Sequence, residues 1–116
     1  MKQKEVVNAR EAIMKIYESS PGWMKGDRIV KLRRTLKKLQ EIIDQYDDLL
    51  SVLLKDKGKK ELKRGEPGYD EVLQKLEESL NMEVEIKIEK VLEEEDCLKI
   101  GLSLKEIEQI ETLGLV

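Results

Sequence analysis

Cationic side chains crowd one short stretch of this sequence, where they could hold phosphates or an acidic protein surface. Seven Lys and Arg residues fall between positions 25 and 38. Six of them, with two large apolar residues that precede them, make up the candidate binding surface: Trp23, Met24, Arg28, Lys31, Arg33, Arg34, Lys37 and Lys38. No aromatic platform or base-reading motif accompanies the cations. A protein partner is therefore favoured, and nucleic acid is the alternative.

Four acidic residues follow on the same stretch: Glu41, Asp44, Asp47 and Asp48. Carboxylates at such helical spacing hold magnesium in some nucleotide pyrophosphohydrolases. Those enzymes need further carboxylates on a facing helix, and the first helical segment offers only Glu11 and Glu18. A solvated charged face is favoured. We therefore predict no catalytic residue, no metal ligand and no cofactor, and we keep a metal-dependent nucleotide pyrophosphohydrolase as an alternative.

Two residue types restrict the remaining chemistry. The sequence has no histidine, the side chain that most often acts as a general base near neutral pH. Cys97 is the only cysteine, so an intrachain disulfide is excluded and a reducing compartment is favoured. Because Cys97 lies among apolar residues of an expected strand, we predict a buried, inert thiol.

One long helix must position the charged stretch. Apolar residues recur at alternating spacings of three and four, which is the seam of a straight helix about 40 Å long. The seam consists of Ile29, Leu32, Leu36, Leu39, Ile43, Tyr46, Leu50 and Leu53. Burial of this seam within the chain is favoured, and a homodimer through the same stripe is the competing arrangement.

The other elements follow from changes in hydrophobic period. A first helix is predicted at 4–18 and ends where Pro21 and Gly22 break the pattern, with Asp27 as the N-cap of the long helix. A basic loop at 55–68 and a third helix at 69–80 follow. Val84, Ile86 and Ile88 alternate with charged residues, and Leu98, Ile100 and Leu102 alternate again, so a β-hairpin is predicted at 83–102.

A last helix at 103–113 completes the expected fold. Ser103 and Glu106 have the spacing of a capping box at its start. The fold class is thus α+β and mostly α, a single domain over residues 1–116. It consists of an antiparallel helical hairpin at 4–54 with one long helix, a third short helix, a small β-hairpin and a C-terminal helix.

Composition limits the setting. Charged residues make up 41% of the 116 residues, and the net charge of -3 provides no global attraction to nucleic acid or to an anionic membrane. No stretch approaches the roughly 20 apolar residues of a membrane span. We expect a protein without membrane contact.

The order of segments resembles a family of small proteins of unknown function that are encoded by phages and prophages of Gram-positive bacteria. Three segments and the start of the last helix carry the resemblance: Glu5–Arg10, Ile29–Arg34, Glu83–Ile88 and Leu102–Leu104. It covers nearly the whole chain. It implies a viral origin, action in the host cytoplasm, and a helical hairpin followed by a small β element, and it brings no catalytic residues.

These expectations combine into one hypothesis about function. The chain is expected to be a phage-encoded, non-catalytic protein-binding factor that acts on a host protein as an inhibitor or modulator, or on a virion assembly component. A rigid, charged helical face suits docking to a larger protein. The identity of the partner, the stage of infection and the choice between monomer and homodimer stay open.

Overall fold

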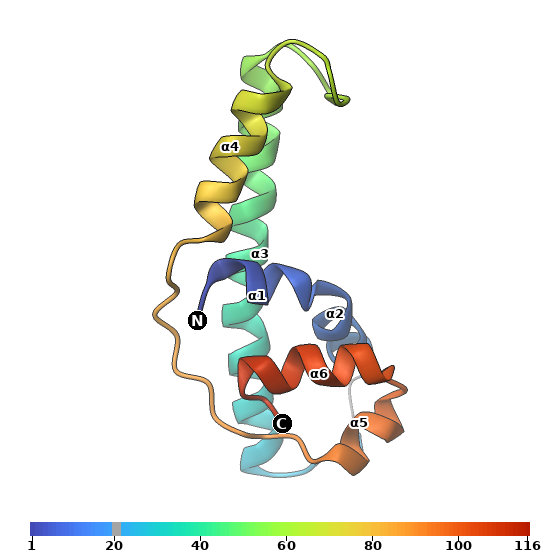
Figure 1. The fold of residues 1–116 in the computed structure, drawn as a ribbon. Coiled ribbons are helices and arrows are strands. Elements are labelled where there is room, and N and C mark those ends of the chain that lie inside the picture. Colours follow the sequence, from blue (N-terminus) through green and yellow to red (C-terminus); the bar gives the residue numbers. More distant parts are fainter. Residues whose placement is uncertain (20–21) are drawn as a thin grey trace.

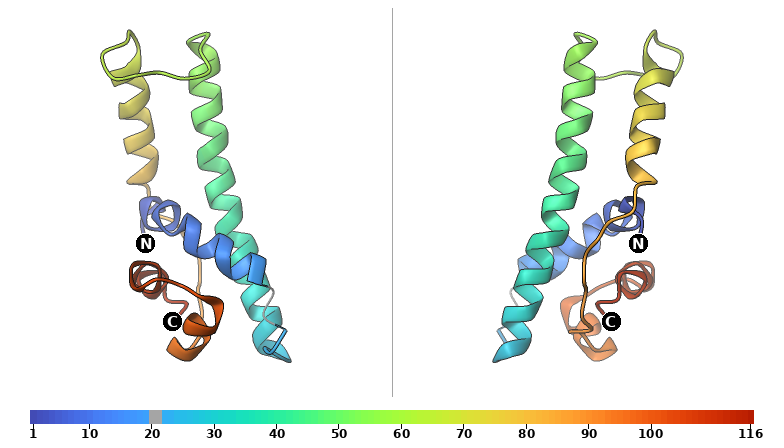
Figure 2. Two further views of the ribbon diagram at one scale, coloured as in Figure 1. Left: turned by 90° about the vertical axis from the view of Figure 1, so that its right-hand side faces the viewer. Right: turned by 90° about the vertical axis from the view of Figure 1, so that its left-hand side faces the viewer.

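The computed structural model describes residues 1–19 and 22–116, and within them the chain forms six helices and no strand. The other helices lie along one side of one long helix (Figure 1 and Figure 2). In chain order the six helices are α1 (Gln3–Asn8), α2 (Arg10–Ser19), α3 (Asp27–Asp56), α4 (Tyr69–Leu80), α5 (Glu94–Ile100) and α6 (Leu104–Leu113). The predicted helices at 69–80 and at the C-terminus are confirmed.

The α+β fold class is wrong, because no β-hairpin exists between residues 83 and 102. Residues 83–93 are extended but pair with no neighbouring strand, and a single antiparallel bridge joins Glu83 to Lys2. The alternation itself is real. Val84, Ile86 and Ile88 are half-buried whereas the residues between them are exposed. An extended chain that lies along helices has the same two-residue period as a paired strand, so this alternation does not establish a sheet. The small β element that the resemblance implies is contradicted by the same finding.

The second half of the predicted hairpin is helix α5. Glu93 occupies its N-cap position and forms a capping box with Asp96, whose carboxylate accepts a hydrogen bond from the Glu93 backbone nitrogen at 2.9 Å. Acidic residues fill the first turn, where they stabilise the positive end of the helix dipole. Gly101 ends the helix in the left-handed conformation at φ 87°. The acidic stretch at 93–96, which would be the turn of the predicted hairpin, is thus a helix start.

Helix α3 is the spine of the molecule, as predicted, and it has two different halves. Its first half packs against α1 and α2, whereas its second half packs mainly against α4 (Figure 2). Buried side chains are concentrated in the first half: Leu32, Thr35, Leu36, Leu39 and Ile43, with Leu53 the only one in the second half. Gly26 occupies the N-cap position that was predicted for Asp27, and Asp27 is the first helical residue. Its carboxylate still lies at the positive end of the helix.

The antiparallel hairpin is formed by α3 and α4 and does not lie at 4–54. The predicted first helix is divided at Ala9 into α1 and α2, and α2 crosses the first half of α3 obliquely (Figure 2). Helix α2 ends at Ser19, and Pro21, which was predicted to end it, lies outside the described residues. The first half of α3 therefore belongs to a globular body, which also contains α1, α2, the extended segment, α5 and α6. The second half of α3 and α4 form a two-helix projection from this body.

Both ends of the described chain hold the extended segment against the body. The backbone nitrogen of Gln3 donates to the carbonyl of Met82, and that of Val84 donates to the carbonyl of Met1. The carbonyl oxygen of Leu115 accepts hydrogen bonds from the backbone nitrogens of Val91 and Leu92. Leu92 and Leu115 are fully buried. The extended segment thus takes the place of a helix in covering the body core.

Glu106 is a buried carboxylate that joins α6 to α2. Its Oε1 accepts hydrogen bonds from the Nζ of Lys15 at 2.7 Å and from the Ser103 backbone nitrogen at 2.9 Å. Ser103 Oγ in turn accepts from the Glu106 backbone nitrogen, which completes the predicted capping box. The hydrogen bonds from Lys15 and from the Ser103 backbone hold the pKa of Glu106 below its ordinary value.

We expect Glu106→Gln to lower the free energy of unfolding by about 1 kcal/mol at pH 7, because glutamine can still cap α6 but loses the ion pair with Lys15. The folded-state pKa is depressed, so this contribution is complete above the ordinary pKa of 4.5 and is lost as the pH falls through the folded-state value. Urea denaturation of both proteins at neutral pH and well below the folded-state pKa measures the difference. If Glu106→Gln lowers the free energy of unfolding by the same amount in acid as at pH 7, the ion pair between Glu106 and Lys15 is not the cause of the loss.

Candidate functional site

A groove between α2 and the first half of α3 contains two residues of the predicted binding surface, Arg33 and Lys37. It has a volume of about 510 Å³. Helix α2 contributes Ile13, Ile16 and Tyr17, and α3 contributes Ile29, Leu32, Arg33, Leu36, Lys37 and Gln40. Helix α2 crosses the first half of α3 obliquely (Figure 2), and side chains of both helices line the groove.

The floor of the groove is apolar and its rim is exposed. Ile13, Ile16, Leu32 and Leu36 are buried members of the body core. Tyr17 lies at the mouth with 68% of its surface exposed. A large side chain of a partner could therefore contact core residues without a rearrangement of the helices.

All formal charge that lines the groove is positive. Arg33 and Lys37 are one helical turn apart on the same face of α3 and are both exposed. Gln40, one turn further, donates a hydrogen bond from its Nε2 to Asp44 Oδ1 at 2.9 Å. No acidic side chain is among the described residues that line the groove. The site therefore combines an apolar floor with two neighbouring cations.

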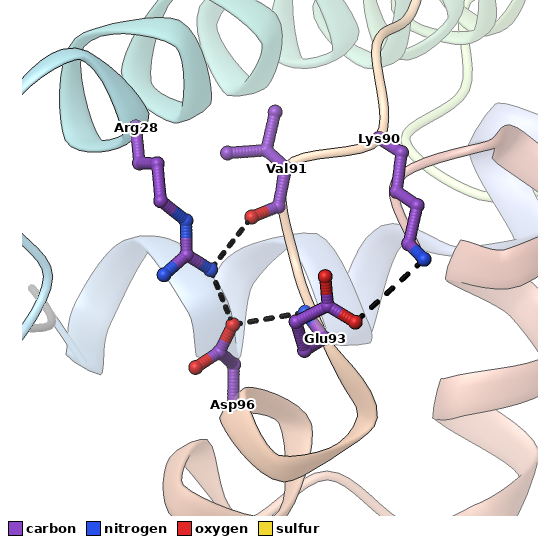
Figure 3. Close-up of polar contacts among 5 residues, drawn as sticks. All are labelled: Arg28, Lys90, Val91, Glu93 and Asp96. Atoms are coloured by element: carbon purple, nitrogen blue, oxygen red, sulfur yellow. Dashed lines mark hydrogen bonds and ion pairs between the residues drawn. The ribbon is translucent and has the colours of Figure 1, made fainter.

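Arg28 belongs to the structure of the body and not to a free binding surface. Its Nη2 donates to the carbonyl oxygen of Val91 at 2.9 Å and to Oδ2 of Asp96 at 2.6 Å (Figure 3). The same Asp96 oxygen accepts from the Glu93 backbone, and Lys90 pairs with the Glu93 carboxylate at 3.6 Å. Arg28 thus joins the start of α3 to the start of α5.

The other predicted cations lie on different sides of α3. Lys31 pairs with Glu89 of the extended segment at 3.5 Å. Arg34 and Lys38 are exposed and are not part of the groove, because each is displaced by about 100° around the helix from its neighbour Arg33 or Lys37. The acidic partners of the cations come from the extended segment and α5.

The two apolar residues of the predicted surface are separated by the structure. Met24 is buried in the body core, so it closes the end of the core between α2 and α3. Trp23 is 41% exposed, and the Nζ of Lys99 lies 4.9 Å from the centroid of its ring. Neither residue lines the groove.

The acidic residues of α3 do not converge on one point. Asp47 pairs with Arg10 of α2, and Asp44 accepts from Gln40, while Glu41 and Asp48 are exposed. Over residues 1–19 and 22–116, no group of three or more His, Cys, Asp or Glu side chains is arranged to hold a metal ion.

Cys97 is fully buried, as predicted, but it lies in α5 and not in a strand. Burial, followed by the neighbouring charge of Asp96, raises the pKa of the thiol. A raised pKa keeps the sulfur protonated and unreactive at neutral pH.

Two further findings concern the chain as a whole. Among the helices of the described chain, none has both the length and the apolar character that crossing a membrane requires. In comparisons with known proteins, no family model, no curated protein and no solved structure matches this chain.

Proposed function

We propose that this chain is a non-catalytic protein-binding factor that holds an acidic, amphipathic segment of a partner protein in the groove between α2 and α3. The observation that carries the proposal is the combination of a buried apolar floor with a rim whose only formal charges are Arg33 and Lys37. The resemblance to phage-encoded proteins makes a host protein or a virion component the expected class of partner.

The shape of the groove favours a helix as the bound element. Two oblique helices with an apolar floor between them resemble the grooves that accept the apolar face of an amphipathic helix. Such a helix presents apolar side chains at positions i, i+3, i+4 and i+7, which can enter the groove while its polar face stays in water. Because the floor is already formed, binding requires little reorganisation of this chain.

The charge of the rim selects the sign of the partner. Carboxylates next to the apolar anchors of the partner would pair with Arg33 and Lys37, whose guanidinium and ammonium groups are exposed. A basic helix with the same apolar residues would place like charges together and would bind less well. The groove therefore distinguishes acidic from basic segments.

The distribution of the cations supports a protein partner over nucleic acid. Phosphate binding depends on many cations that face one strand together. Here Arg28 and Lys31 pair with Asp96 and Glu89, and the remaining four divide between the groove and another side of α3.

The decisive variant reverses the charge of the rim. Two helical peptides of about 16 residues serve as probes, with the same apolar residues and either Glu or Lys beside them. We expect micromolar affinity for the acidic peptide and a loss of about tenfold in the double variant Arg33→Glu, Lys37→Glu. Fluorescence anisotropy with a labelled peptide measures both affinities.

The chain offers a matched control for this variant. Arg34→Glu with Lys38→Glu changes the net charge equally and on the same two turns of α3, but outside the groove. Equal losses in both double variants, or equal affinity for the two peptides, would contradict specific docking. If both double variants also lose binding to single-stranded DNA to the same extent, nucleic acid binding through the whole cationic stretch would be the better function.

A further inference from the structure

The second half of α3 and helix α4 form a projection that we call the arm, which comprises residues 44–80. Figure 1 shows the arm extending away from the body, with the loop at its tip furthest from α5 and α6. The molecule measures 51 Å along its long axis and 26 Å and 20 Å across, and the arm accounts for much of this elongation. At its base the arm is held by α1 and α2, through Gln3 with Ser79 and Arg10 with Asp47, and beyond this base only the two helices and their loop are present within the described chain.

The apolar seam of the arm is incompletely covered. Ten apolar or aromatic residues point toward the seam by their spacing: Tyr46, Leu49, Leu50, Leu53, Leu54, Tyr69, Val72, Leu73, Leu76 and Leu80. Only Leu53 and Val72 among them are buried, and Leu73 is 39% exposed. Val52 adds a further apolar side chain that is 54% exposed. Two helices form a single layer, and a second layer is needed to bury both sides of such a seam.

The two ends of the arm have opposite charge. The loop at the tip, residues 55–66, includes six Lys or Arg residues and three acidic residues, and the first turn of α4 adds Asp70 and Glu71, so the tip keeps a small positive excess. Residues 39–54 contain no Lys or Arg, and Glu41, Asp44 and Asp48 leave a negative surface at the base of the arm and just before it, where Asp47 is already paired with Arg10. The base of α4 adds Glu77 and Glu78. The arm is therefore complementary in charge to a copy of itself that runs in the opposite direction.

Part of each charged end is available to a second molecule. In the described structure, Lys60, Lys63 and Arg64 at the tip take part in no ion pair, whereas Lys57 pairs with Glu71 and Lys59 with Glu66. At the base, Glu41 and Asp48 are exposed and likewise take part in no ion pair among the described residues. Asp48 and Lys55 are two turns apart on one face of α3. In an antiparallel pair, Asp48 of each copy would therefore lie beside Lys55 of the other copy.

From this burial and charge pattern we infer that two copies of the chain associate through their arms, antiparallel, as a four-helix bundle. The two-fold axis crosses the arm near its midpoint, so the tip of each arm lies beside the base of the other. The half-buried leucines form the new core, and the charges at its edge set the direction. The contact is short, since each helix of the arm is about 20 Å long, and a micromolar dissociation constant is therefore expected.

Sedimentation equilibrium over a concentration series tests the association directly. The intact chain is expected to change from monomer to dimer over roughly micromolar to hundreds of micromolar concentrations, with weaker association at high salt. A chain that stays monomeric over this whole range would overturn the inference. An arm that remains monomeric but binds a helical protein of a different sequence would identify a heterologous partner and would equally overturn it.

Apolar substitutions locate the contact. The double variant Val52→Glu, Leu73→Glu is expected to raise the dissociation constant of the dimer at least about tenfold. Leu98→Glu with Leu104→Glu is the matched control, because both leucines are more exposed than Val52 and lie on the body. Circular dichroism confirms that both double variants retain their helices. An equal effect of the two would place the contact elsewhere.

Charge exchange tests the direction and remains informative if an apolar variant fails to fold. A tip variant changes Lys60, Lys63 and Arg64 to Glu, and a base variant changes Glu41, Asp44 and Asp48 to Lys. For each variant alone, the dissociation constant of the homodimer is expected to rise about tenfold, whereas a mixture of the two variants is expected to form a heterodimer. A chain that carries all six changes is expected to form a homodimer again. Failure of both the mixture and the sixfold variant to associate would overturn the antiparallel arrangement, and neither outcome depends on the groove.

Discussion

Leu39→Ala is expected to lower the free energy of unfolding by about 3 kcal/mol, the largest effect of any single change considered for this chain. Leu39 is fully buried in the first half of α3, within the core that α1, α2, the extended segment and α6 share. Removal of its side chain leaves a cavity that helices held from several directions cannot close. Urea denaturation followed by circular dichroism measures the loss.

Leu50→Ala is the matched control. Leu50 belongs to the same predicted seam and undergoes the same substitution, but it lies in the arm and is half-buried. We expect this change to cost about 1 kcal/mol, because solvent already reaches part of the side chain in the monomer. Equal costs for the two substitutions, measured at concentrations where the chain is monomeric, would show that the arm is as well packed as the body.

Asp96→Ala is expected to lower the free energy of unfolding by about 2 kcal/mol, the second largest effect. One carboxylate oxygen serves both the capping box of α5 and the ion pair with Arg28, and the side chain is nearly buried (Figure 3). Arg28 is half-exposed, so solvent reduces the share that the ion pair contributes. The same denaturation experiment measures the total cost.

A double-mutant cycle separates the two contributions of Asp96. Arg28→Ala removes the ion pair and leaves the cap, and the combined variant Arg28→Ala, Asp96→Ala gives the coupling energy between the residues. A coupling energy near 1 kcal/mol is expected. Absence of coupling would show that Asp96 acts through the cap alone. Asp48→Ala, which removes an exposed carboxylate from α3, is expected to change the stability little.

The helices that could be predicted from the sequence are those with local signals at both ends. The α6 helix follows from the capping box of Ser103 and Glu106, and α4 follows from its apolar face and the glycine-rich loop before it. The extended segment could not be distinguished from a strand, because strand pairing depends on a distant partner and the local pattern reports only burial on one side. Leu98 lies in α5 and is exposed, whereas Leu102 lies in the turn after α5 and is buried. The apparent alternation of Leu98, Ile100 and Leu102 therefore combined residues of a helix with a residue of the turn that follows it.

The candidate site was predictable only in part. Arg33 and Lys37 are identified from the density of cations, but nothing in the helical spacing of Ile13, Ile16 and Tyr17 distinguishes the wall of a groove from an ordinary core face. A groove arises from the angle at which two helices cross, and that angle depends on side-chain packing over the whole contact. The pairing of Arg28 with Asp96 spans 68 positions in the sequence and has no local signature.

The uninterrupted course of α3 has a consequence for avidity. The same rigid helix carries the groove in its first half and the arm in its second half. In a dimer of antiparallel arms the two grooves would lie about 50 Å apart on opposite sides of the symmetry axis, at a separation fixed by helical rise. A partner that displays its acidic segment repeatedly at that spacing would be bound at both sites, and the second contact would form at a high effective concentration. Modest affinity at each groove would then suffice to discriminate an ordered array of such segments from a single free copy.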